Sequence, residues 1–160
     1  PTIKATKLPV VAAGGYADGA QVLAAQVMGA AGVQMGTRFL VADECEIHEG
    51  YKEAIIDAKE YETDITGTLA GEPVRQIAND MTKQSLEYEK RGASEEEFIE
   101  LYTGTLKRAV FEGDRKTGSM MAGTSIGLIE ERQSVVEIFE ELKEEYNKAL
   151  EDIENAKKFF

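Results

Sequence analysis

Apolar residues follow one pattern in the first quarter of the chain and another in the rest of it. Residues 8–13, LPVVAA, form a short apolar run bounded by Pro9 and Gly14. Such a run is typical of a strand that is buried on both faces in a parallel sheet. The segment ADGAQVLAAQVMGAAG follows, and Asp18 is placed to cap a helix within it. The inner side of that helix is expected to carry Val22, Leu23, Val27 and Ala30.

The same pattern then repeats. Residues 32–40, GVQMGTRFL, join a second short apolar strand to a glycine and lead into a turn at residues 43–46. Strand, glycine turn, helix, strand and glycine turn together predict a βαβ unit built from small residues.

Beyond residue 43 the chain is rich in Glu and Lys, and its apolar residues have helical spacing. We predict helices over residues 51–61, 73–90, 94–112 and 134–158. Gly92 is suited to end the second of these helices, and Ser94 with Glu97 forms a capping box for the third. A second capping box pairs Ser134 with Glu137. The apolar stripe of the last helix comprises Val135, Ile138, Phe139, Leu142, Tyr146, Leu150 and Ile153.

Composition narrows the class of protein. A chain of 160 residues with 42% apolar residues can bury an ordinary core, and it has no apolar run long enough to span a membrane. The single Cys45 excludes an internal disulfide and favours a reducing, cytoplasmic compartment. A net charge of −12 disfavours nucleic acid and anionic membranes as partners. We expect no metal site. Because the first residue is Pro1 and not a Met, we expect the true start of the protein to lie upstream of this sequence.

The two glycine turns are the candidate chemistry. Gly14 and Gly15 follow the first predicted strand, and Gly36 and Thr37 follow the second. Unpaired N–H groups and the positive end of a helix dipole attract anions, and adjacent parallel strands place both turns on one rim. In barrels of eight βα units, the loops after the last two strands commonly bind phosphate. The alternative is that the glycines only permit positive φ and close helix packing. Their occurrence in consecutive units favours phosphate.

Four segments carry a family resemblance: PVVAAGGYADG, AAGVQMGTRFL, IHEGYKEAI and GSMMAGTSIGLI. In this order they resemble the C-terminal half of the FMN-dependent enoyl-acyl-carrier-protein reductase II family and its relatives, the nitronate monooxygenases. The resemblance implies an α/β fold in which residues 1–50 are the last two βα units of a TIM (β/α)8 barrel. Residues 51–160 are then a mostly helical region with a Gly/Met loop at 118–128. The FMN phosphate is expected on the backbone of Gly14, Gly15, Gly36 and Thr37.

The resemblance also implies an activity and a missing part. Family members of the reductase type use NADH or NADPH, through FMN, to reduce an enoyl thioester on acyl carrier protein or coenzyme A in fatty acid biosynthesis. The first six barrel strands and the catalytic His precede the matched region, so we expect an N-terminal half as partner, an inactive isolated chain and a homodimeric parent. We expect His48 to be structural or solvent-facing. The alternatives are a nitronate monooxygenase, which uses FMN and oxygen, and a non-catalytic fragment.

The loop GSMMAGTSIGLI has two interpretations. Its small residues and adaptable methionines suit a ligand contact by Ser119, Met120, Met121 and Ala122, whereas the alternative is a loop that packs a helix onto the barrel. By the resemblance, Thr124 stands where relatives usually carry Gln.

The reductase interpretation also raises the possibility of a basic patch for the acidic carrier protein. Its candidate residues are Lys52, Arg75, Lys83, Lys107 and Arg108. Solvated helix faces explain the same residues.

Overall fold

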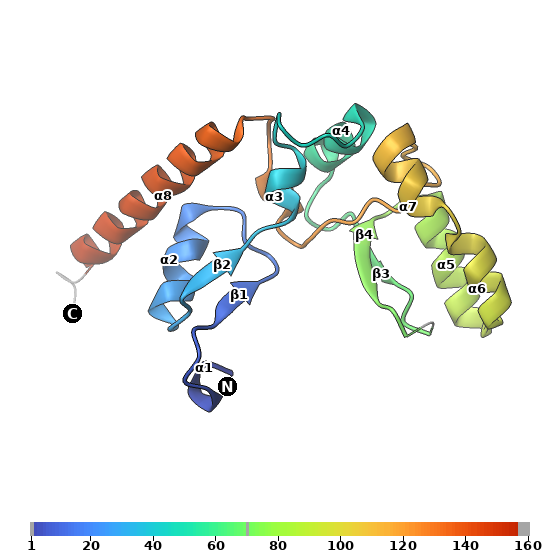
Figure 1. The fold of residues 1–160 in the computed structure, drawn as a ribbon, viewed down its shortest axis with the longest axis horizontal. Coiled ribbons are helices and arrows are strands. Elements are labelled where there is room, and N and C mark those ends of the chain that lie inside the picture. Colours follow the sequence, from blue (N-terminus) through green and yellow to red (C-terminus); the bar gives the residue numbers. More distant parts are fainter. Residues whose placement is uncertain (1, 70, 157–160) are drawn as a thin grey trace.

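The computed structural model describes residues 2–69 and 71–156 and divides them into two lobes joined through a central layer (Figure 1). The first lobe contains α1 (Thr2–Ala5), β1 (Val11–Ala13), α2 (Gly19–Val27), β2 (Gly32–Gln34) and α8 (Val135–Ala156). The second lobe contains β3 (Thr63–Thr66), β4 (Val74–Ile77), α5 (Asp80–Arg91), α6 (Glu95–Tyr102), α7 (Thr105–Lys107) and a π-helical turn, Arg108–Glu112. The central layer contains α3 (Thr37–Leu40), α4 (Glu49–Asp57) and a 3₁₀ turn, Ile126–Leu128.

The predicted βαβ unit is confirmed. β1 and β2 pair in parallel, with Val11 opposite Gly32 and Ala13 opposite Gln34, and α2 is the crossover between them. Asp18 caps α2 as expected, since its carboxylate accepts the backbone N–H of Gln21 at 2.7 Å in a complete capping box. The carboxyl ends of both strands therefore lie at the same edge of the sheet.

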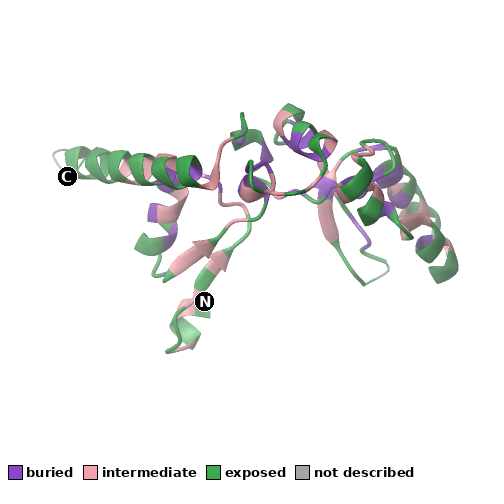
Figure 2. Cartoon of the chain, turned by 45° about the horizontal axis from the view of Figure 1, so that its top comes forward, coloured by how far each residue is buried: buried purple, intermediate pink, exposed green. Residues whose placement is uncertain are grey.

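The prediction that these strands are buried on both faces is wrong for this chain. Val11 is 57% exposed, and β1 and β2 each have only one strand neighbour within the described residues. Val27, expected on the inner side of α2, is 74% exposed. Figure 2 shows the pair of strands in the colours of exposed and half-buried residues. An apolar run favours the strand conformation, but burial of the strand also needs neighbouring elements, which the described residues do not supply.

The long helix α8 returns to the first lobe and packs against α2, although the two are far apart in sequence (Figure 1). Gly19 allows the close approach, because a Cβ there would overlap the carbonyl oxygen of Leu142. Ile138 and Leu142 are buried, whereas Phe139, Leu150 and Ile153 are exposed, so the apolar stripe is covered only in part. The predicted helix 134–158 is confirmed up to Ala156, and residues 157 and 158 lie outside the described residues.

The predicted helix over residues 73–90 is wrong in its first part. Residues Val74–Ile77 form β4, which pairs antiparallel with β3, and α5 begins only at Asp80 behind its Asn79 cap. The buried Gln76 amide donates to the Thr66 hydroxyl across the hairpin at 2.5 Å. Two short polar strands without clear alternation gave no strand signal, so the hairpin in the region expected to be mostly helical was missed.

The predicted helix over residues 94–112 begins as expected but is interrupted. The Ser94–Glu97 capping box is present, and Gly92 ends α5 with a left-handed φ of 66°. Helix α6 ends at Tyr102, and Gly104, two residues further on, adopts a left-handed φ of 76°. The chain then continues as α7 and the π-helical turn.

The central layer holds the two lobes together through one hydrophobic core. Tyr51 and Ile55 of α4 pack there with Met120 and Ile126, and the Tyr51 hydroxyl donates to the Met121 carbonyl at 2.7 Å. Burial raises the pKa of Tyr51 well above its ordinary value, so this hydroxyl keeps its proton. None of the helices in the described ranges is both long and apolar enough to cross a membrane.

Candidate functional site

The turn after β1 offers free backbone donors. Gly14 and Gly15 have φ angles of 98° and 79°, a region that favours glycine. Within residues 2–69 and 71–156, neither N–H group donates to a protein acceptor. The end of α2, which we expected to add its dipole, is already paired: the N–H of Gly19 donates to the Glu145 carboxylate at 2.7 Å, and Asp18 caps the first turn. An anion here would therefore be held by the turn alone.

The turn after β2 distinguishes the two interpretations of the glycines. Gly36 has a φ of −107°, which any residue adopts, and a Cβ built on it meets nothing within 4 Å. Neither backbone conformation nor packing against the described residues requires glycine at this position. A ligand that must approach the backbone closely would require it. The alternative interpretation therefore accounts for Gly14 and Gly15 but not for Gly36.

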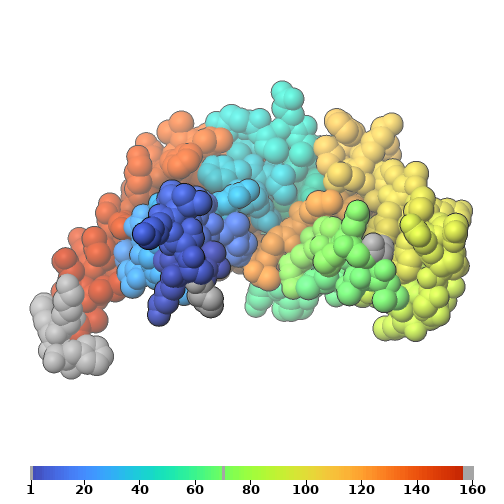
Figure 3. All heavy atoms as spheres, turned by 60° about the horizontal axis from the view of Figure 1, so that its bottom comes forward, coloured from blue at the N-terminus to red at the C-terminus, as the bar shows by residue number. Residues whose placement is uncertain are grey.

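The Gly/Met loop forms the third side of this open site. The N–H of Gly123 donates to the Thr37 hydroxyl at 2.8 Å, and a Cβ on Gly15 would lie 2.9 Å from the Thr124 hydroxyl oxygen. The loop therefore touches both glycine turns. Figure 3 shows this orange segment between the blue N-terminal part of the first lobe and the green hairpin. The parallel strands and the loop bring together all four predicted phosphate-binding residues.

The four residues predicted to approach the substrate are mostly interior. The Ser119 hydroxyl donates to the Gln76 amide oxygen at 2.6 Å, and Met120 and Ala122 lie in the core. Met121 is 39% exposed. Contact between these residues and a substrate stays a prediction, and Met121 is best placed for it.

Sequence reasoning missed a small cavity of about 180 Å³ between the hairpin and α6–α7. Its lining includes Thr66, Gln76, Tyr102, Thr105, Ser119 and Met121. Only a predicted hairpin would have revealed it, because these residues are far apart in sequence.

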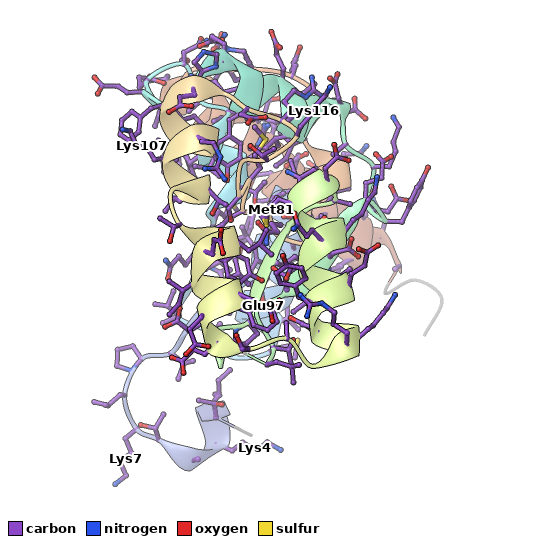
Figure 4. All side chains as sticks on the ribbon, turned by 90° about the vertical axis from the view of Figure 1, so that its right-hand side faces the viewer. Lys4, Lys7, Met81, Glu97, Lys107 and Lys116 are labelled. Atoms are coloured by element: carbon purple, nitrogen blue, oxygen red, sulfur yellow. The ribbon has the colours of Figure 1, made fainter. Side chains whose placement is uncertain are left out.

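The proposed basic patch does not form as one surface. Lys52 is 1% exposed, and its ammonium donates to the Ala42 carbonyl at 2.8 Å, because α4 buries the Lys stem in the central layer. Lys83 pairs with Asp80 at 3.7 Å. Figure 4 shows Lys107 at the same end of the second lobe as Lys116.

His48 is exposed and caps α4, with its Nδ1 accepting the Gly50 N–H at 2.9 Å. It therefore has the structural position expected for it.

The sequence matches the family model described as nitronate monooxygenase over residues 2–145. It is 37% identical over 123 residues to a probable nitronate monooxygenase of Staphylococcus saprophyticus, in a match that covers 77% of this chain and 35% of the relative. A probable nitronate monooxygenase of Staphylococcus haemolyticus is 36% identical over 118 residues, covering 74% of this chain and 33% of the relative. The chain thus spans about a third of the length of these relatives.

Solved structures match over nearly the whole chain. FabK from Thermotoga maritima superposes with a TM-score of 0.90 and 38% identity, covering 95% of this chain and 48% of FabK. A nitroalkane oxidase from Streptomyces ansochromogenes superposes with a TM-score of 0.76 and 27% identity, covering 94% of this chain and 42% of the oxidase. The chain therefore spans about half of each structural relative.

Proposed function

Because this chain belongs to the nitronate monooxygenase family, we propose that it is the C-terminal part of a flavin-dependent oxidoreductase and that its two glycine turns hold the phosphate of FMN. The observation that carries the proposal is the open space above Gly36, where neither the backbone conformation nor packing against the described residues requires glycine. Among residues 2–69 and 71–156, the N–H groups of Gly14, Gly15 and Gly36 have no protein acceptor, and together with Thr37 they would supply the donors that a phosphate monoester accepts.

The residues of this chain bind and orient; they do not carry out the redox step. When bound, FMN supplies hydride transfer between reduced nicotinamide and a substrate. The turn N–H groups fix the phosphate end, and the core around Tyr51, Met120 and Ile126 holds the Gly/Met loop beside them. We propose that the remaining barrel strands and the catalytic His belong to an N-terminal half, as the relatives' greater length suggests.

For the substrate we propose an enoyl thioester carried by acyl carrier protein or coenzyme A, reduced with NADH or NADPH in the cytoplasm by a homodimer. Two observations support the reductase. FabK superposes with the higher TM-score, 0.90 against 0.76 for the nitroalkane oxidase, and it has the higher sequence identity, 38% against 27%.

The second candidate is nitronate oxidation by FMN and oxygen. It is supported by the names of the staphylococcal relatives and of the family model.

The deciding experiment uses the protein expressed from the complete reading frame that contains this chain. We expect it to purify with bound FMN and to oxidise reduced nicotinamide only when an enoyl thioester is added, in the absence of oxygen. Oxygen consumption with a nitroalkane and no nicotinamide requirement would reverse the ranking. Absence of flavin and of both activities would leave the non-catalytic fragment.

The isolated 160-residue chain should be inactive, because two parallel strands with free edges do not make a stable barrel. Its mass in solution and a nicotinamide oxidation assay with added FMN test this. An active, well-folded monomer would contradict both the half-barrel argument and the reductase assignment.

A further inference from the structure

The Thr124 hydroxyl lies over the first glycine turn with no hydrogen-bond partner among residues 2–69 and 71–156. Thr124 is exposed, and its hydroxyl oxygen lies 2.9 Å from the position that a Cβ on Gly15 would occupy. The oxygen is thus in the space beside the turn whose N–H groups are free.

The backbone on both sides of Thr124 is held in place. On one side, the preceding Gly123 donates its N–H to the Thr37 hydroxyl at 2.8 Å, so Thr124 is tied to the second glycine turn. On the other side, Ser125 is buried, and Ile126 is fully buried in the core and donates its N–H to the Gly123 carbonyl at 3.3 Å. A loop whose backbone is held in this way loses little conformational freedom on binding a ligand.

A phosphate dianion has three terminal oxygens, each able to accept more than one hydrogen bond, and such charge-assisted bonds are stronger than neutral ones. We propose that the Thr124 hydroxyl donates a hydrogen bond to the flavin phosphate, as a further binding residue beside Gly14, Gly15, Gly36 and Thr37. The inference rests on the proposed function, because it needs a flavin phosphate at the two turns. It assigns a cofactor contact to the Gly/Met loop, which is also joined to the second lobe by the Ala122 N–H and the Arg75 carbonyl.

The test compares two flavins that differ only in the phosphate. Apoprotein from the complete reading frame is titrated with FMN and with riboflavin, and the dissociation constants are measured by quenching of flavin fluorescence. Thr124→Val removes the hydroxyl and keeps the shape, whereas Thr124→Ser keeps the hydroxyl. Thr68→Val, at another exposed threonine in the β3–β4 turn, is the matched control.

We expect Thr124→Val to weaken FMN binding about tenfold or more, as loss of a hydrogen bond to a charged group does, and to leave riboflavin binding within about twofold. Thr124→Ser and Thr68→Val should bind both flavins like the wild type. An unchanged ratio of the two dissociation constants in Thr124→Val overturns the inference, whether both affinities fall together or neither changes. A wild-type protein that binds FMN no better than riboflavin overturns the proposed phosphate site as well.

Discussion

Gly36→Ala is the sharpest test of the phosphate site, because the structure predicts that it will separate stability from cofactor binding. Gly36 precedes α3 with a φ of −107°, and its Cβ position is open to 4 Å. Alanine at a helix N-cap costs a few tenths of a kcal/mol to about 1 kcal/mol relative to glycine. Reduced freedom of the unfolded chain returns about 0.4–1 kcal/mol. The free energy of unfolding of the apoprotein should therefore change by less than about 1 kcal/mol.

FMN binding should respond much more strongly to the same change. If the turns bind the phosphate as proposed, the added methyl group occupies the space through which a phosphate oxygen would reach the turn N–H groups. Hydrogen bonds to a charged group contribute about 1.5–3 kcal/mol each. Loss of two such bonds weakens the affinity by about a hundredfold or more. Urea denaturation of the apoprotein and a fluorescence titration with FMN measure the two quantities on one preparation.

Gly118→Ala is the control with the opposite expectation. A Cβ on Gly118 would lie 2.9 Å from the backbone of Ala109, so this variant should lose stability while its folded fraction binds FMN normally. Gly15 is less informative, because its φ of 79° strains any replacement. The site assignment is refuted if Gly36→Ala is folded and binds FMN within twofold of the wild type. If Gly36→Ala fails to fold, the space above the turn is not open.

Three further changes test the contacts around the site. Asp18→Ala removes the α2 cap and should lower the free energy of unfolding by about 1 kcal/mol in urea denaturation, and no loss would contradict the capping role. Ser119→Ala leaves the buried Gln76 amide oxygen without its donor and should cost about 1–3 kcal/mol in the same assay; an unchanged midpoint would contradict a role for that bond. Hydrogen bonds from the Thr117 hydroxyl and from backbone N–H groups lower the pKa of Asp114, so its contribution is present above its unfolded pKa and is lost as the pH falls through the folded value. Asp114→Asn should therefore lose stability near neutral pH and show less further loss below about pH 4, and an unchanged acid dependence would refute this.

The sequence predicted the features of the fold that depend on local chemistry. Asp18, Ser94 and Gly92 mark helix ends correctly, because caps and left-handed glycines act on the nearest turn of backbone. The hairpin of β3 and β4 was missed because its stability comes from a cross-strand partner and from burial of Gln76, neither of which is visible in a window of sequence.

The candidate site was predictable only in part. Glycines after two strands of one βαβ unit indicated both turns, and the parallel register places them on one edge. The proximity of Thr124 to the first glycine turn could not be foreseen, because residues 15 and 124 meet only through the fold. The burial of Lys52 was equally hidden, since its sequence neighbours are those of an exposed helix face.

The second lobe leaves the central layer after α4 and returns to it at Met120, and Ala58 and Met120 lie in the same hydrophobic core. Its two ends are therefore close in space, as the ends of an inserted module are. A module attached in this way can change its length and sequence during evolution, or be exchanged by protein engineering, while the strand edge with Gly14 and Gly36 keeps its geometry. Ala109, Val110 and Ile77 of this segment also pack in the central core. Diversity among relatives should accordingly concentrate in residues 59–117 outside these three positions, and a chimera that exchanges the segment but keeps them should keep the flavin affinity of its recipient.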